Sequence, residues 1–236
     1  YISRAQITPR HILEKAYSIE KVKETLIPLK DYKPYPTSVE DWKKVVPDSI
    51  IQQVIKNGEE ALSSTFEPIS GSMSLDFVRS GDRSVHGKLS FGKRNRLTAI
   101  ILAESVEGKG RFMEAIFNGI WSICEESFWG VPAHISGTGL PDVENPVVDL
   151  FSAETASVLA IADYFVGDKL DKINKLIRKR IYFETNRRIF IPMTTNSDRY
   201  GWMSKTRPVN NWNPWIMSNW LMSTLLLEQN DQRRVD

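Results

Sequence analysis

Cysteine is nearly absent from this chain of 236 residues, which contains only Cys124. A single cysteine excludes an intrachain disulfide, so the cysteine content carries no information about the redox compartment. Because Cys124 lies in an apolar stretch with helical spacing, we expect it to be a small core residue and not a nucleophile.

The chain also lacks an excess of either charge, since its 31 basic and 29 acidic residues give a net charge of +2. Proteins that bind nucleic acids through their phosphates carry a pronounced basic surface, so we expect no nucleic-acid partner. No apolar run of membrane-spanning length is free of charges, so we expect no membrane insertion. With 41% hydrophobic and 25% charged residues, the composition is typical of a soluble globular protein.

Several catalytic motifs are missing as well. The chain has no P-loop, no GxSxG, no CxxC, no HExxH and no GxGxxG after a strand. Its three histidines, His11, His86 and His134, are not spaced as metal ligands. We therefore expect neither a metal nor a cofactor, and we assign His11 and His86 to structure or surface.

Helical periodicity of apolar residues governs most of the chain. It predicts helices at residues 8–26, 38–46, 47–58, 97–106, 111–128, 149–165 and 168–190, and a further one that starts at Asn213. Four glycines punctuate residues 63–93, which are the least periodic part and could hold short strands at 75–78 or 88–91.

The predicted helices have similar lengths and are joined by alternately short and long loops, as in a ring of helical hairpins. The sequence therefore predicts a mainly all-α fold, an incomplete (α/α) toroid. Residues 1–93 would form an irregular lead-in segment, and residues 94–236 would form the portion of the toroid. Because a closed ring needs more helices, we expect either an open arc or an N-terminal piece of a longer protein.

Tryptophan and asparagine are concentrated in residues 209–220, VNNWNPWIMSNW, which hold three of the seven tryptophans and four asparagines. Asn213 followed by Pro214 predicts a helix start, because Asn is a preferred N-cap and Pro suits the first helical position. The apolar run that follows, residues 215–227, would carry this helix into the core.

Asn210, Asn211 and Trp212 would then lie in the loop over the positive end of that helix. Free N–H groups at a helix N-terminus suit a carboxylate. Asparagine amides add neutral donors, and an indole face offers a stacking surface for a sugar ring. This combination predicts a site for an acidic sugar. The alternative is a capped core helix, which we favour for Trp215 and Trp220.

A second candidate segment is residues 121–134, WSICEESFWGVPAH. Glu125 and Glu126 end a helix, where negative charge is unfavourable, so we expect a basic partner or a place in a cleft. Adjacent helical residues do not face each other, so at most one of the two carboxylates enters a site. In the loop that follows, Trp129 and His134 are candidates, His134 as a proton carrier. A structural histidine within an ordered loop is an equal alternative.

A third candidate segment lies just before residue 208, where basic and aromatic residues alternate. Such a pattern can bind an acidic polysaccharide through charge and ring contacts, although an exposed loop without function explains it equally well. The residues concerned are Arg199, Tyr200, Trp202, Lys205 and Arg207.

Two of these segments resemble a known family. Residues 210–219, NNWNPWIMSN, resemble the NNWN motif of the heparinase II/III-like polysaccharide lyases, and residues 123–134, ICEESFWGVPAH, resemble the Trp-then-PAH segment that precedes it. The similarity covers residues 97–227. It implies an incomplete (α/α) toroid, an acidic, uronate-containing polysaccharide or oligosaccharide as the partner, and periplasmic or secreted localisation.

The chemistry that this resemblance implies is β-elimination. One side chain neutralises the C5 carboxylate, and tyrosine or histidine removes the C5 proton and protonates the leaving oxygen. Asn210 or Asn211 would neutralise the carboxylate, with His134 in the same cleft. Where this chain has Asn211, many such lyases have histidine. Substrate contacts would come from Trp129, Trp202, Trp212, Tyr200, Arg199 and Glu126.

The family's catalytic tyrosine and its C-terminal β-sheet domain would both lie beyond Asp236, so we expect this chain alone to be inactive. Two other functions remain open at this point. One is a toroidal glycoside hydrolase that uses Glu125 or Glu126 with Asp142. The other is a non-catalytic glycan-binding module, in which Trp202 and Trp212 stack on sugars.

Overall fold

The chain is mostly helical, as expected, and no strand occurs among the residues that the computed structural model describes, which are 11–135, 137, 139–195, 200–203 and 208–236. The α-helices are α1 (Ile12–Ala16), α2 (Ile19–Thr25), α3 (Val39–Val45), α4 (Asp48–Leu62), α5 (Gly71–Ser80), α6 (Ser84–Glu107), α7 (Met113–Cys124), α8 (Leu150–Ile173), α9 (Leu176–Thr185), α10 (Ile191–Thr195), α11 (Trp212–Leu227) and α12 (Asp231–Val235). Short helical turns are η1 (Leu29–Asp31), η2 (Pro132–His134) and η5 (Gly201–Met203), and η3 (Asn186–Phe190) is a turn of π-helix.

The two short strands expected in the first part of the chain are wrong. Residues 75–78 lie inside α5, and residues 88–91 lie inside α6. Gly87 and Gly92 weaken a helix only by about 1 kcal/mol each relative to alanine, and packing outweighs this cost. The buried face of α6 continues on both sides of them, from His86 and Ser90 to Leu97. A division of the chain between residues 93 and 94 would therefore fall in the middle of a continuous helix.

Two other expected helices have different boundaries. The first, at 8–26, is split in its described part into α1 and α2 at Tyr17 and Ser18, and the Ser18 hydroxyl caps α2 by accepting from the backbone N–H of Lys21. The helix expected to end at residue 165 instead continues through Gly167 to Ile173. Gly167 lies inside α8, and its lack of a Cβ leaves room for the guanidinium of Arg178 to pack against the helix.

Local structure at three positions agrees with the helix boundaries and the core residue that the sequence predicts. The Ser38 hydroxyl caps α3 by accepting from the backbone N–H of Asp41. Gly108 ends α6 with φ of 75°, a left-handed conformation that glycine adopts without strain. Cys124 is buried, and burial raises the pKa of its thiol to about 12, so it is a core residue with little thiolate.

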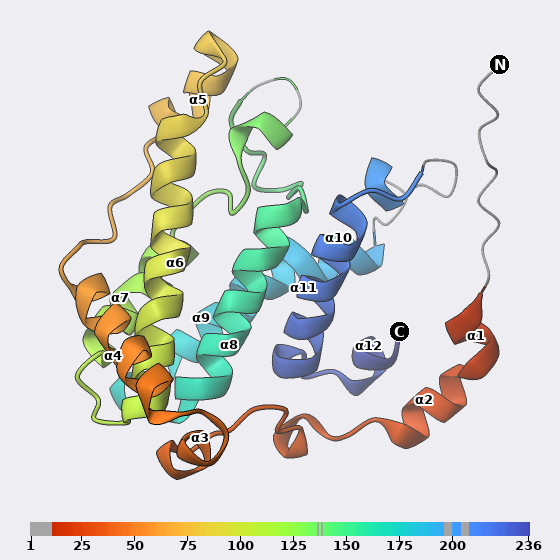
Figure 1. Ribbon diagram of the computed structural model, residues 1–236. Coiled ribbons are helices and arrows are strands. Elements are labelled where there is room, and N and C mark those ends of the chain that lie inside the picture. The colour runs from red at the N-terminus through yellow and green to blue at the C-terminus, as the bar shows by residue number, and fades with distance from the viewer. Residues whose placement is uncertain (1–10, 136, 138, 196–199, 204–207) are drawn as a thin grey trace, which may run out of the picture.

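The long helices α4, α6, α8 and α11 pack side by side in that order, with α7 and α9 behind them (Figure 1). The helices α6, α8 and α11 all begin at the upper end of this view and run downward. The segments between them, which include α7 and α9, return the chain to that end. The N-terminal ends of three core helices and the turn η2 are thereby gathered at one end of the molecule.

The N-terminal arm, α1 to α3, crosses the opposite end (Figure 1). Tyr164 of α8 holds the arm in place through two hydrogen bonds. Its hydroxyl donates to the carbonyl of Tyr35 at 2.6 Å and accepts from the Tyr35 N–H at 3.2 Å. Trp42 of α3 packs on Phe165, with ring centroids 5.7 Å apart. The arm therefore stabilises the lower end and leaves the upper end uncovered.

Within the described part of the chain, α8 is the one helix long and apolar enough to cross a membrane. Its apolar window is 61% buried in the protein, as in the core helix of a globular domain, which meets the same criteria. By itself α8 is therefore weak evidence for a membrane span.

Candidate functional site

Five aromatic rings from four elements meet at the upper end of the helices. Phe91 of α6 packs on Phe151 of α8, with ring centroids 4.6 Å apart. His134 of η2 stacks parallel to Phe151 at 5.9 Å and contacts Trp212 of α11 at 4.6 Å. Trp215, one turn later in α11, lies edge-on to Phe151 at 6.2 Å. The two segments singled out in the sequence, 121–134 and 209–220, thus meet at His134 and Trp212.

The ring of His134 is held by a buried carboxylate. Its Nδ1 lies 2.7 Å from Oδ2 of Asp149, which is fully buried and also accepts from the backbone N–H groups of Val131 and Ser152. A carboxylate can only accept here, so Nδ1 carries the proton, and in the neutral form of the ring Nε2 has a lone pair. Nε2 has no hydrogen-bond partner among the described residues, and the side chain is 18% exposed. This geometry suits proton transfer at Nε2.

The start of α11 differs from the prediction. The helix begins at Trp212, with Asn211 at the N-cap position, so the expected N-cap role of Asn213 is wrong. Asn213 instead accepts from the backbone N–H of Asn210 at 3.0 Å and donates to the carbonyl of Trp202. Asn210 Oδ1 accepts from the backbone N–H of Trp212 at 2.9 Å. Asn210 and Asn213 therefore hold the turn: Asn213 uses both its side-chain oxygen and its side-chain nitrogen, and Asn210 uses its side-chain oxygen.

Asn211 differs from both, because it is not needed to hold the turn. Its side chain is exposed and makes no hydrogen bond with the rest of the described chain. The neighbouring side chain, Trp212, contacts His134. Asn211 is therefore the better candidate of the pair for donating to a ligand.

A cavity of about 280 Å³ opens beside the rings. It is lined by Phe91, Arg94, Asn95, Phe151, Glu154, Thr155 and Trp215. Aromatic walls with a few polar groups are typical of a carbohydrate or small-molecule site. The Trp215 indole N–H donates to Oε2 of Glu154 at 3.2 Å, which fixes one wall.

The floor of this cavity rests on a buried ion cluster. Glu126 lies 3.1 Å from Nζ of Lys93 and 2.6 Å from Nη2 of Arg94. All three side chains are at most 5% exposed. Nε of Arg94 also donates to Thr155 at 2.9 Å. Glu126 has the basic partners that its position at a helix end required, but its carboxylate is inside the protein, where a substrate does not reach it.

The neighbouring Glu125 points outward and pairs with Arg180 at 3.2 Å, with its side chain 56% exposed. The two carboxylates therefore have separate environments, as the helix geometry predicted. Neither Glu125 nor Glu126 lines the cavity that Asp142 lines, whereas a glycosidase needs two carboxylates that flank one glycosidic bond.

His86 is a site-region residue that the sequence reasoning missed. It is buried on α6, its Nδ1 has no partner in the described chain, and burial lowers its pKa while the charge of Glu126 opposes this. Asp149 also acts on it electrostatically. Residues 86, 90, 93 and 94 share one helical face, but the glycines at 87 and 92 obscure this pattern in the sequence.

The third candidate segment has a structural place where it is described. Tyr200 is buried and stacks on Trp202, with centroids 5.7 Å apart, and their polar atoms donate to the carbonyls of Pro146 and Val148. Arg199, Lys205 and Arg207 lie outside the described residues.

Trp129 is buried too, and its position does not fit stacking on a substrate in the ring site. Its indole N–H donates to the carbonyl of Ile123 at 2.9 Å, and Arg188 covers its ring at 4.7 Å. Over the described ranges, no group of His, Cys, Asp and Glu side chains could hold a metal ion.

Alanine variants of the three asparagines should separate these roles. Asn210→Ala and Asn213→Ala each remove a hydrogen bond that fixes the helix start, so each should lower the free energy of unfolding by roughly 1 kcal/mol. Asn211→Ala should leave the melting temperature unchanged. If Asn211 donates to developing charge on the substrate, its removal should cost about 2.7–4 kcal/mol in the transition state.

Melting curves and turnover of all three variants provide the measurement, in preparations that degrade the substrate. An Asn211→Ala protein that melts early and keeps its turnover would show that Asn211 is structural.

Comparison with protein-family models and with curated proteins finds no match to this chain.

Proposed function

We propose that this chain is the N-terminal toroid portion of a polysaccharide lyase that cleaves uronate-containing glycans by β-elimination. The observation that carries the proposal is the meeting of His134, held by Asp149, with Trp212 and the exposed Asn211 at the start of α11. The proposal also rests on the resemblance of both segments to the heparinase II/III-like lyases.

In the proposed reaction, the Asn211 amide donates to the C5 carboxylate and makes the C5 proton removable. A base takes this proton, the electron pair of the C5–H bond forms the C4–C5 double bond, and the C4–O bond breaks. The leaving oxygen then takes a proton. His134 is suited to one of these two proton transfers, because Asp149 directs the lone pair to Nε2. The rings beside it supply stacking surface for the sugar.

The arrangement of the helices supports the toroid. The core helices α6, α8 and α11 run in the same direction, and α7 and α9 return the chain behind α6 and α8 (Figure 1). Repetition of this hairpin would continue the row as an arc, with the ring site at its upper rim. Such an enzyme would act on extracellular glycans, so we also propose periplasmic or secreted localisation.

One product assay tests the proposal. Incubation with heparin, chondroitin and alginate, in the presence of any further domain that the full protein carries, should generate unsaturated ends that absorb in the ultraviolet. His134→Ala serves as the control, because it should remove this signal without preventing the protein from folding.

Two results would contradict the proposal. New reducing ends without the unsaturated chromophore would indicate a hydrolase. Saturable binding of these polymers without any turnover would indicate a glycan-binding module.

A further inference from the structure

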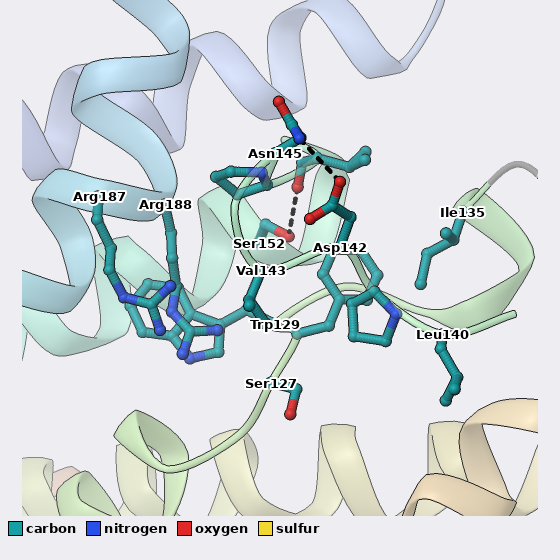
Figure 2. A pocket seen from close by; sticks show the side chains of 14 residues that line it. Ser127, Trp129, Ile135, Leu140, Asp142, Val143, Asn145, Ser152, Arg187 and Arg188 are labelled. Atoms are coloured by element: carbon teal, nitrogen blue, oxygen red, sulfur yellow. Dashed lines mark hydrogen bonds between the residues drawn. The ribbon is translucent and has the colours of Figure 1, made fainter. Parts of the chain in front are cut away.

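A second cavity, of about 210 Å³, is lined by residues 127–129, 135, 140–143 and 145–147 together with Ser152, Arg187 and Arg188 (Figure 2). It shares no lining residue with the cavity beside the rings. The arginine end holds Arg187 and Arg188, and Asp142 and Asn145 lie across the cavity from them (Figure 2). A single water molecule occupies only about 10–15 Å³ of such cavity volume, so this cavity admits a ligand of many atoms.

The arginine end carries more positive charge than its own partner neutralises. Nε of Arg180, Arg187 and Arg188 each donates to the single carboxylate of Glu184, all at 2.8 Å. Arg180 has a second carboxylate, Glu125, at 3.2 Å. Arg187 and Arg188 have no other carboxylate among the described residues. The negative charge of Glu184 is therefore divided among three arginines, and Arg187 and Arg188 keep a net positive charge.

Arg187 and Arg188, which line the cavity, each have a guanidinium nitrogen without a partner among the described residues. The Nη1 atoms of Arg187 and Arg188 make no hydrogen bond with any described residue. Arg188 is 5% exposed, and burial and the charge of Arg187 both lower its pKa, against the effect of Glu184. An anion here would relieve this repulsion, and a guanidinium can bind carboxylate or sulfate through two parallel hydrogen bonds.

Both arginines belong to the π-helical turn η3. Such single turns inside helices occur frequently at functional sites. In this protein, the turn directs two consecutive arginines toward the ring of Trp129 and the cavity (Figure 2).

The opposite end has a different chemistry. Asp142 accepts from the backbone N–H of Glu144 at 3.0 Å and from the amide of Asn145 at 2.8 Å. Its negative charge repels a small anion that would fill the whole cavity but attracts hydroxyl groups. Between the two ends lie apolar surfaces of Trp129 and Val143 (Figure 2). The cavity thus fits a ligand that is anionic at one end and bears hydroxyls at the other.

We propose that this cavity is a subsite for one acidic sugar residue, with its carboxylate or sulfate group on Arg187 and Arg188 and its hydroxyls toward Asp142. The identity of the ligand as a sugar rests on the proposed function; its charge and polarity rest on the lining residues alone. The subsite would bind a charged residue of the glycan that is not the one being cleaved.

Calorimetric titration of the chain with glucuronate, glucose 6-sulfate and glucose tests this inference. Glucose should bind at least about tenfold more weakly than the better of the two acidic sugars, because it lacks the charge-assisted hydrogen bonds. The two acidic sugars distinguish a carboxylate from a sulfate ester as the preferred group.

The decisive variant is Arg187→Gln, with Arg180→Gln as its matched control. The two side chains are 30% and 29% exposed and both bind Glu184, but only Arg187 lines the cavity. Arg187→Gln should weaken binding of the acidic sugar at least about tenfold, and Arg180→Gln less than about twofold. Asp142→Asn should strengthen binding of inorganic sulfate, because it removes a like charge.

Equal binding of glucose and both acidic sugars, or an equal loss in both arginine variants, would overturn the inference. The result is independent of turnover. If binding depends on Arg187 but polymers yield no unsaturated product, the proposed function fails and the subsite stands. If polymers are cleaved but Arg187→Gln binds the acidic sugars like the unaltered protein, the subsite fails and the proposed function stands.

Discussion

Replacement of His134 with alanine is expected to lower kcat on uronate polymers by roughly 10²- to 10⁴-fold, the usual contribution of one proton-transferring side chain. Removal of the ring should disturb the fold little. Asp149 loses one hydrogen bond, but its carboxylate still accepts from the backbone N–H groups of Val131 and Ser152. The melting temperature should therefore fall only slightly, by the loss of ring contacts.

Asp149→Asn tests whether the carboxylate positions this ring. Asparagine can still accept from the N–H of Ser152 and cap α8, but its amide N–H₂ favours the histidine tautomer with the proton on Nε2. In a comparable pair, the wrong tautomer lowers kcat about 10⁴-fold. We expect kcat to fall far more than KM rises in this variant.

Phe151→Leu is the matched control for both substitutions. It removes the ring that stacks on His134 at 5.9 Å but leaves the hydrogen bond to Asp149 in place. Its kcat should remain within about tenfold of the unaltered enzyme, because the loss of a ring that lines the cavity should act mainly on KM. Early melting with unchanged kcat in His134→Ala would show that His134 is a structural residue of its loop, the alternative that the sequence left open.

The helical class of the fold and the importance of residues 121–134 and 209–220 followed from local signals. The spacing of apolar residues indicates helices directly, and clusters of Trp, Asn and His can be recognised in the sequence without knowledge of the fold. The contact of His134 with Trp212 was expected only through a family resemblance, since residues about eighty positions apart have no local signal that brings them together.

The errors concern features that tertiary packing decides. The glycines of α6 looked like helix breakers, although the buried face from His86 to Leu97 holds the helix together. Asn213 looked like an N-cap because Pro214 follows it, but Trp202 offers its side chain a different partner. Neither the carbonyl of Trp202 nor the buried cations around Glu126 can be located from sequence spacing.

Glu126 was expected to contact substrate, and its observed surroundings predict a different result on mutation. Glu126→Gln would leave Lys93 and Arg94 buried without their counter-charge. Removal of one partner from a buried ion pair typically costs about 3–5 kcal/mol. In a protein of this size, each 1 kcal/mol corresponds to roughly 2–4 °C, so the melting temperature should fall by roughly 6–20 °C.

The adjacent Glu125→Gln is the matched control, because it removes the same charge one residue away. Glu125 is exposed and pairs with Arg180 at the surface, where a salt bridge contributes about 0–1 kcal/mol. Thermal unfolding of both variants, together with Glu126→Gln combined with Lys93→Met, provides the measurement. The double variant also removes the buried charge of Lys93, which Glu126→Gln leaves without a counter-ion, and should recover part of the lost stability. If Glu126→Gln instead raises KM while melting normally, the carboxylate meets substrate after all, and the ion cluster opens in solution.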